Sequence, residues 1–124
     1  FKIKNKKRRD ILLAYLDDLP DKIITPHKYA VESKIINSVD HIMPILLPSE
    51  SNKEKVINSL KKQNIQTTMH YPAPWRFSAY KKEFLKSMNP VTDEITAREI
   101  TLPLHTLMTQ KDARKVCFEL KKVI

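Results

Sequence analysis

Apolar side chains recur three and four positions apart near both ends of the chain. Residues 5–19 carry such a stripe, with Asn5 as a candidate cap and Pro20 as the stop, and this pattern predicts a helix. Near the C-terminus, Thr109 together with Asp112 predicts the capped start of a second helix. The apolar face of this last helix consists of Ala113, Val116, Cys117 and Leu120.

Between these helices, residues 39–47 are nearly all apolar from Ile42 onward. A continuous apolar run of this length predicts a strand that is buried on both faces. Pro44 lies inside the run, and a proline has no N–H to donate to a neighbouring strand. We therefore expect Pro44 at a non-pairing edge or at a bulge.

The pattern then changes to helical spacing over residues 52–63. Ser51 and Glu54 have the spacing of a capping box and predict the start of this helix. Asn64 suits the left-handed position that ends a helix, which matters in a chain without glycine. The β-branched residues after it predict a second strand over residues 65–70.

Shorter segments complete the pattern. They predict a loop with short extended pieces over residues 21–38, a short helix over 77–87, one or two helical turns over 91–100 with Thr92 as the cap, and a short strand over 100–105 that Pro103 halts. Helices gathered on one face of a small sheet are typical of an α+β fold. We therefore predict a two-layer domain with a small, largely antiparallel sheet covered by helices.

Composition narrows the classes of function. The 124 residues suit one domain, and the absence of glycine excludes the glycine-rich loops of Walker and Rossmann nucleotide sites. A formal net charge of +9, with lysine and arginine crowded into residues 2–9, favours an anionic partner such as nucleic acid, an acidic membrane or a phosphorylated small molecule. The alternative is a solvated helix face.

Cysteine usage and hydropathy bear on location. A single cysteine allows no internal disulfide and fits a reducing compartment, so we expect a cytoplasmic protein. The longest apolar run, residues 42–48, is too short to span a bilayer, and we expect no membrane partner. Because the chain begins with Phe1, we expect it to be a fragment of a longer protein.

Candidate chemistry is sparse, because the sequence shows no self-sufficient catalytic set. None of the four histidines has zinc-ligand spacing, so we expect no metal site. His70 ends a predicted strand, and Pro72 and Pro74 hold the following chain extended, which aims the imidazole toward a cleft. The alternative is a histidine satisfied by neighbouring backbone. Trp75 and Arg76 could stack on a base or grip a phosphate, or Trp75 could simply pack a helix onto the sheet.

Two motifs stand in register over the second half of the chain. "NIQTTMHYPAP", residues 64–74, is followed by "FSAY", and "AREITLPLHTLMT" covers residues 97–109. They resemble the GIQT-x-x-HYP segment and the A-x-R-x-x-[ST]-LPL-H-P-x-[LM]-T signature of the DegT/StrS-type sugar aminotransferases. "HIMPILLP" is similar to the strand that opens that family's small domain, and "KKRRDILLAYLDDLP" to the helix that joins it to the large domain. Asn64 replaces the family's glycine and Thr106 its proline.

The resemblance implies an enzyme that depends on pyridoxal 5'-phosphate and has a fold of type I. Such enzymes transfer an amino group, usually from glutamate, to a nucleotide-linked keto sugar, here for polysaccharide or lipopolysaccharide biosynthesis. Residues 1–124 resemble only the small C-terminal domain, with residues 1–20 as the helix that joins it to a large domain. The large domain would carry the Schiff-base lysine, the cofactor site and part of a homodimer interface. The isolated chain is then expected to be inactive, because it has no cofactor to act as an electron sink.

The same resemblance assigns the site residues. The family's histidine falls on His70, which is expected to line the sugar-nucleotide pocket, and Tyr71 and Pro72 match beside it. Trp75 and Arg76 stand where the family varies, so they are expected to tune substrate choice or to have no role. No catalytic or cofactor-binding residue is expected in this chain.

Two readings from other classes stay open beside the enzyme fragment. The first is a basic module that binds nucleic acid, which the charge suggests. The absence of an aromatic-and-basic strand motif and of glycine argues against this module. The second is a non-catalytic α+β domain that serves dimerisation or regulation, whose unpartnered faces would make it sticky.

Overall fold

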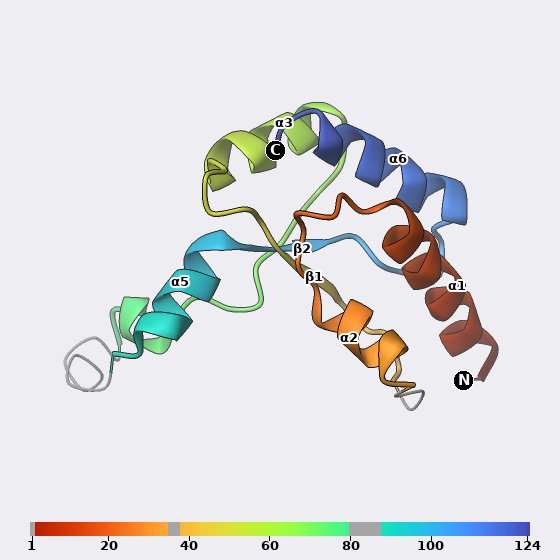
Figure 1. Ribbon diagram of the computed structural model, residues 1–124, viewed down its shortest axis with the longest axis horizontal. Helices are drawn as coiled ribbons and strands as arrows, with labels where there is room; N and C mark the ends of the chain where they lie inside the picture. Colours follow the sequence, from red (N-terminus) through yellow and green to blue (C-terminus); the bar gives the residue numbers. More distant parts are fainter. Residues whose placement is uncertain (1, 35–37, 80–87) are drawn as a thin grey trace.

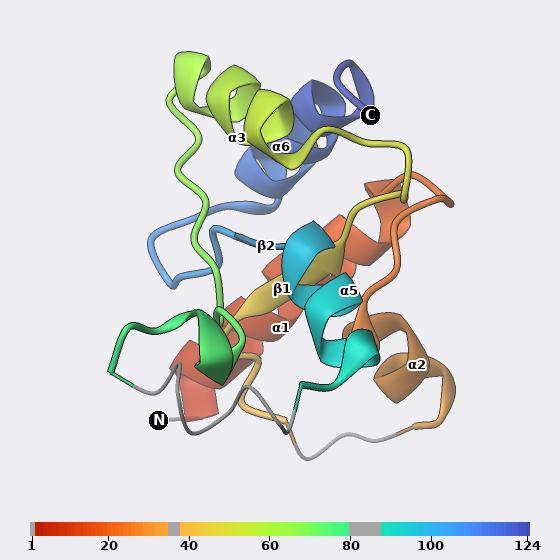
Figure 2. The same cartoon turned by 90° about the vertical axis from the view of Figure 1, so that its left-hand side faces the viewer.

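A computed structural model describes residues 2–34, 38–79 and 88–124. Its elements are α1 (Lys2–Asp18), α2 (Pro26–Glu32), β1 (Met43–Leu46), α3 (Lys53–Lys62), the 3-10 turn η1 (Pro74–Arg76), α5 (Pro90–Arg98), β2 (Glu99–Leu102) and α6 (Gln110–Lys121). Figure 1 shows the two strands crossing at the centre, with α1, α3 and α6 on one side and α2 and α5 on the other. The view from the side in Figure 2 keeps α3 and α6 apart from α2 and α5. The predicted α+β class is confirmed.

The sheet is small and antiparallel, as predicted. β1 pairs with β2 from Met43 opposite Leu102 to Leu46 opposite Glu99. Single bridges extend it on both sides, Ile24 to Leu46 beyond β1 and Thr68 to Thr101 beyond β2.

The strand predicted over residues 65–70 is therefore wrong in extent, because only Thr68 pairs. The ladder does not continue past Thr68, because the His70 N–H donates to the side chain of Glu99 and not to a strand carbonyl.

Pro44 lies opposite Thr101 in the register, at a position where the two strands form no hydrogen bond, so no N–H is needed there, as expected. The strand has no bulge at Pro44. Its partner Thr101 directs both its N–H and its carbonyl toward Thr68, on the side away from β1. Pairs without mutual hydrogen bonds alternate along an antiparallel ladder, so no N–H is missed between Pro44 and Thr101. The Pro44 carbonyl instead accepts a hydrogen bond of 2.9 Å from the Thr25 hydroxyl.

The hydrophobic core lies between the sheet and the helices α1, α3 and α6. The predicted apolar face of α6 is buried in full, and Ile100 and Leu102 of β2 meet it. The other main contributors are Ile11, Leu12, Tyr15, Met43, Ile45, Leu47, Val56, Leu60 and Ile65. Because side chains alternate along a strand, Glu99 and Thr101 project from the opposite face of β2.

The helix ends agree with the sequence in two places. Thr109 and Asp112 form a complete capping box at the start of α6. Asn64 has φ 59°, and the N–H groups of Asn64 and Ile65 bond the carbonyls of Lys61 and Leu60. This is the Schellman arrangement that a left-handed residue allows.

Other predicted helix boundaries need correction. The cap of α3 is Asn52, whose side chain accepts from the Lys55 N–H, and not Ser51. The cap of α5 is Asn89 and not Thr92. In both cases the side-chain oxygen of an Asn accepts from N–H groups in the first turn, that of Lys55 in α3 and those of Val91 and Thr92 in α5.

The predicted loop over residues 21–38 contains the helix α2. This helix has no buried residue and so shows no apolar stripe in the sequence. Most of the predicted helix over residues 77–87 lies outside the described residues. Among the helices of the described ranges, none is long and apolar enough to cross a bilayer.

Candidate functional site

A cavity of about 480 Å³ opens beside β2 and holds His70 in its wall. The wall is formed by residues 63–70, by the chain that follows β2 and by the first half of α6. Apolar side chains such as Ile65, Leu102 and Met108 line it together with polar ones such as Thr101. A mainly apolar hollow with a few convergent polar groups is the usual form of a small-molecule site.

His70 is half-buried and is held by β2 through two hydrogen bonds. Its backbone N–H donates to Glu99 Oε2 over 3.3 Å, and its ring Nδ1 lies 2.9 Å from Thr101 Oγ1. Thr101 in turn donates to Glu99 Oε1 over 2.6 Å. The histidine is thus fixed by side chains rather than only by neighbouring backbone, and it remains at the wall of the cavity.

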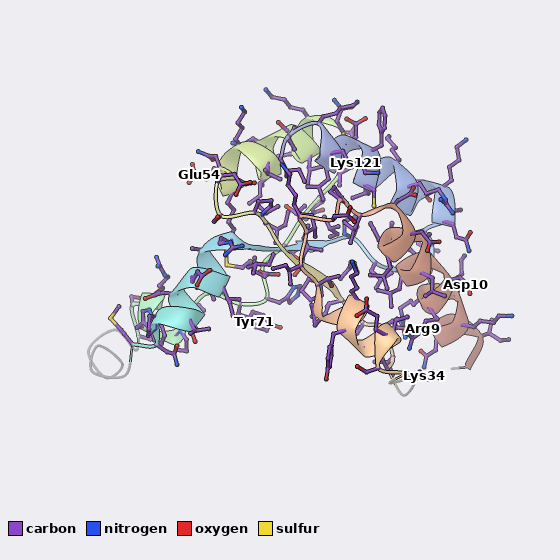
Figure 3. The ribbon with its side chains drawn as sticks, in the orientation of Figure 1. Arg9, Asp10, Lys34, Glu54, Tyr71 and Lys121 are labelled. Atoms are coloured by element: carbon purple, nitrogen blue, oxygen red, sulfur yellow. The ribbon has the colours of Figure 1, made fainter. Side chains whose placement is uncertain are left out.

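Tyr71 and Pro72 follow His70 in the chain, but neither of them lines the cavity, and the same holds for Trp75 and Arg76. The phenol ring of Tyr71 is 72% exposed and meets the His70 ring edge to face, with 5.1 Å between ring centres. In Figure 3, Tyr71 lies below the strands in the space between α2 and α5. An exposed aromatic ring of this size is available to a ligand or to another part of a larger protein.

Trp75 and Arg76 are both tied to α5. The Trp75 indole N–H donates to Asp93 Oδ1 over 3.0 Å, and Arg76 forms an ion pair with the same oxygen at 3.1 Å. Trp75 is buried, so its ring packs η1 against α5 and offers no open stacking surface. The Arg76 side chain is more than half exposed and keeps donors for a further anion.

One lysine close to this region has a perturbed pKa. Desolvation lowers the pKa of Lys53, and the charge of Glu99 opposes part of that shift. The ammonium group donates to the Thr96 carbonyl over 2.9 Å. Lys53 therefore ties α3 to α5.

Two further groups with a perturbed pKa, Cys117 and Tyr15, lie in the hydrophobic core. Burial raises the pKa of the Cys117 thiol to about 12, and burial likewise raises the pKa of Tyr15. The Tyr15 hydroxyl donates to the Pro103 carbonyl over 2.8 Å. Over the ranges that the structure describes, no cluster of three or more ligand side chains suits a metal ion.

Three residues of this region were missed from the sequence, namely Glu99, Thr101 and Asp93. Glu99 and Thr101 carry a signal that could have been used, because the alternation of "EITL" puts both polar side chains on one face of a short strand. The pairing of that face with His70 depends on the register with Thr68, which the sequence does not display. Asp93 meets Trp75 across 18 positions and leaves no local pattern.

Comparison with known proteins shows the family of this chain. The model of the DegT/DnrJ/EryC1/StrS aminotransferase family matches residues 1–121. The chain belongs to this family. The expected resemblance is thereby confirmed over almost the whole chain.

Individual family members are similar to it in sequence and in fold. The UDP-4-amino-4,6-dideoxy-N-acetyl-beta-L-altrosamine transaminase of Campylobacter jejuni is 32% identical over 116 residues, which are 90% of this chain and 30% of that protein. The Helicobacter pylori aminotransferase PseC, involved in pseudoaminic acid biosynthesis, has a TM-score of 0.83 at 20% identity, over 98% of this chain and 33% of that one. The sugar aminotransferase Spr1654 of Streptococcus pneumoniae in its PMP form gives 0.83 at 24% identity, over 99% of this chain and 31% of that one. The chain thus spans about a third of the length of its relatives.

Proposed function

We propose that this chain is the small C-terminal domain of a pyridoxal-phosphate-dependent aminotransferase that acts on a nucleotide-linked keto sugar. The main support is the position of His70, which β2 holds at the wall of a cavity. The chain also belongs to a family of aminotransferases. The named transaminase of Campylobacter jejuni, whose substrate is a UDP-linked amino sugar by name, supports the substrate class. Glutamate is the proposed amino donor.

We infer that the described residues of this chain do not hold the cofactor. A Schiff base needs an accessible amine next to a group that binds phosphate, but the Lys53 ammonium is engaged with the Thr96 carbonyl. Lys115 lines the cavity and is exposed, but the group near it is the Asp112 carboxylate, which caps α6 and is not a group that binds phosphate. We infer that the cofactor, which supplies the electron sink, is held by the part of the protein that the relatives have in addition.

The chain's own contribution is to bind and orient the sugar nucleotide. His70 offers an imidazole nitrogen to the sugar from the wall of the cavity, and the exposed Tyr71 ring beside it is proposed to meet a part of the ligand outside the cavity, with Pro72 holding the chain there. Arg76 is placed to meet a phosphate, while Trp75 supports it by packing on α5. Orientation of one reactant against another is worth a large share of an enzymatic rate enhancement.

The proposed partners are supported by apolar surface that the described part of the chain leaves exposed. Exposed apolar side chains occur on α2 and on α5, among them Tyr29 and Ile95. We infer that a large cofactor-binding domain and a second subunit of a homodimer complete the site. Helix α1, within residues 1–20, would join the two domains.

The test is a chimera in which residues 1–124 replace the matching third of the Campylobacter jejuni transaminase. The measurement is the rate of amino transfer from glutamate to a UDP-linked keto sugar. We expect turnover by the chimera and none by the 124-residue chain with added pyridoxal phosphate. A chimera that folds as a dimer and binds the cofactor but transfers no amino group to any nucleotide-linked keto sugar contradicts the proposal, as does turnover by the chain alone.

A further inference from the structure

The outer face of β2 buries two polar side chains beside His70. Glu99 is 7% and Thr101 4% exposed, although neither belongs to the apolar core. Burying a carboxylate is costly unless it is hydrogen-bonded. The function proposed above gives these two side chains no role, so their burial calls for an explanation of its own.

The hydrogen bonds among these groups run in one direction. A carboxylate can only accept, so the single hydrogen of the Thr101 hydroxyl is used in the bond to Glu99 Oε1 at 2.6 Å. Thr101 Oγ1 can then only accept from His70 Nδ1, which lies 2.9 Å away. Nδ1 must therefore carry the hydrogen, and in the neutral imidazole Nε2 is left with a lone pair. The second carboxylate oxygen of Glu99 accepts the His70 backbone N–H at 3.3 Å and anchors the same residue again.

We propose that Thr101 and Glu99 are positioning residues that hold neutral His70 in its Nδ1–H tautomer, so that Nε2 accepts a hydrogen bond from a hydroxyl or N–H group of the sugar. The ligand in this statement rests on the function proposed above, whereas the tautomer does not. A neutral Nε2 acceptor cannot bond a phosphate oxygen, since two acceptors share no hydrogen. The negative charge of Glu99 behind the ring also disfavours an anion at that point.

We call the chain of hydrogen bonds from His70 through Thr101 to Glu99 the relay. The charged groups around it do not reverse the direction of these hydrogen bonds. Lys53 of α3 feels the charge of Glu99, and Arg76 of η1 acts on Lys53 in the opposite sense. The Lys53 ammonium donates to Thr96 and Arg76 pairs with Asp93, so neither cation takes the place of Thr101 at Glu99 Oε1.

The tautomer can be measured on the 124-residue chain by long-range ¹H–¹⁵N correlation of the histidine rings, at a pH where the imidazole is neutral. We expect His70 to be protonated at Nδ1. Thr101→Val keeps the shape and removes the hydroxyl, so we expect a shift toward protonation at Nε2. Thr101→Ser keeps the hydroxyl and should retain the Nδ1–H form. Thr92→Val is the matched control, because the Thr92 side chain has no hydrogen bond to another described residue and lies on α5.

A wild-type His70 protonated at Nε2, or a tautomer that Thr101→Val leaves unchanged, overturns the relay. If Thr101→Val fails to fold, Glu99→Gln gives the same test, because its amide can donate to Thr101 and reverse the chain of hydrogen bonds.

The ligand is tested separately in the chimera. Loss of one oriented hydrogen bond should raise the KM for the sugar nucleotide about fivefold in Thr101→Val and leave it unchanged in Thr92→Val. An unchanged KM in Thr101→Val, in an enzyme whose His70→Ala variant does bind more weakly, overturns the assignment of the sugar donor. An unchanged KM in His70→Ala counts against the proposed function and leaves the tautomer standing.

Discussion

Removing Arg9 should destabilise the fold more than removing any exposed cation. Arg9 of α1 places Nε 2.7 Å from Oδ2 of Asp40, just before β1. The Asp40 side chain is only 2% exposed, against 24% for Arg9, and its Oδ1 has no hydrogen-bond partner among the described residues. Asp40 also has φ 46°, which an L-residue adopts at some cost. Figure 3 shows Arg9 on the side of α1 that faces the rest of the domain.

The magnitude follows from this burial. Two unit charges about 4 Å apart attract by about 4 kcal/mol at an effective dielectric constant of about 20. Arg9 is partly solvated, so we place the loss in Arg9→Met at the lower end of the range for a buried charge that loses its partner, about 3 kcal/mol. That is a large fraction of the stability of a domain of this size.

The assay is a double-mutant cycle in urea with Arg9→Met, Asp40→Asn and both together. Asparagine tolerates the left-handed backbone at position 40 and carries no charge, so the double variant should be more stable than the sum of the single losses predicts, by about 2 kcal/mol. Arg114→Met is the matched control, because its ion pair with Asp18 is exposed and should contribute less than about 1 kcal/mol. A loss below about 1 kcal/mol in Arg9→Met, or a coupling energy near zero, refutes the reasoning.

Two further predictions concern the same fold. Asn64→Ala should lower the free energy of unfolding in urea by about 1 kcal/mol, because Asn64 has φ 59° and alanine adopts this conformation at a cost. Asn64→Gly should be nearly neutral. Equal losses in the two variants would show that the left-handed backbone is not the cause. The free energy of unfolding should also fall as pH rises above about 9. Burial raises the pKa of the Cys117 thiol to about 12 and also raises the pKa of the Tyr15 hydroxyl, so both groups keep their protons in the folded chain. In the unfolded chain the same groups lose their protons at lower pH, which favours unfolding. Denaturation midpoints at about pH 8 and pH 10 measure this, with Cys117→Ala to remove the cysteine's share; a midpoint that does not fall speaks against it.

The sequence predicts those elements that bury one clear face. The stripe of α6, its capping box and the left-handed Asn64 are local patterns, and the structure contains all three. Pro44 was placed correctly because a proline can only stand where no N–H is needed. These features depend on neighbours within a few positions along the chain.

The remaining features depend on contacts between distant segments. Helix α2 buries no side chain, and its start is marked only by Thr25 and Pro26, a cap and a first-turn proline that were overlooked. The surroundings of His70 require the pairing of Thr68 with Thr101, 33 positions apart, and periodicity says nothing of such a pairing. The sequence therefore singled out His70, while the groups that hold it came only from the structure.

We propose that the chain presents His70 to a sugar nucleotide in a site that another domain completes. The most direct measurement is the KM of the chimeric aminotransferase for a UDP-linked keto sugar, compared between His70 and His70→Ala. Phe118→Ala, an exposed aromatic on α6, is the matched control. We predict that His70→Ala raises the KM about tenfold, the equivalent of about 1.4 kcal/mol, while Phe118→Ala leaves it unchanged. Equal KM values for the His70 and His70→Ala enzymes, with the fold intact, would contradict the claim.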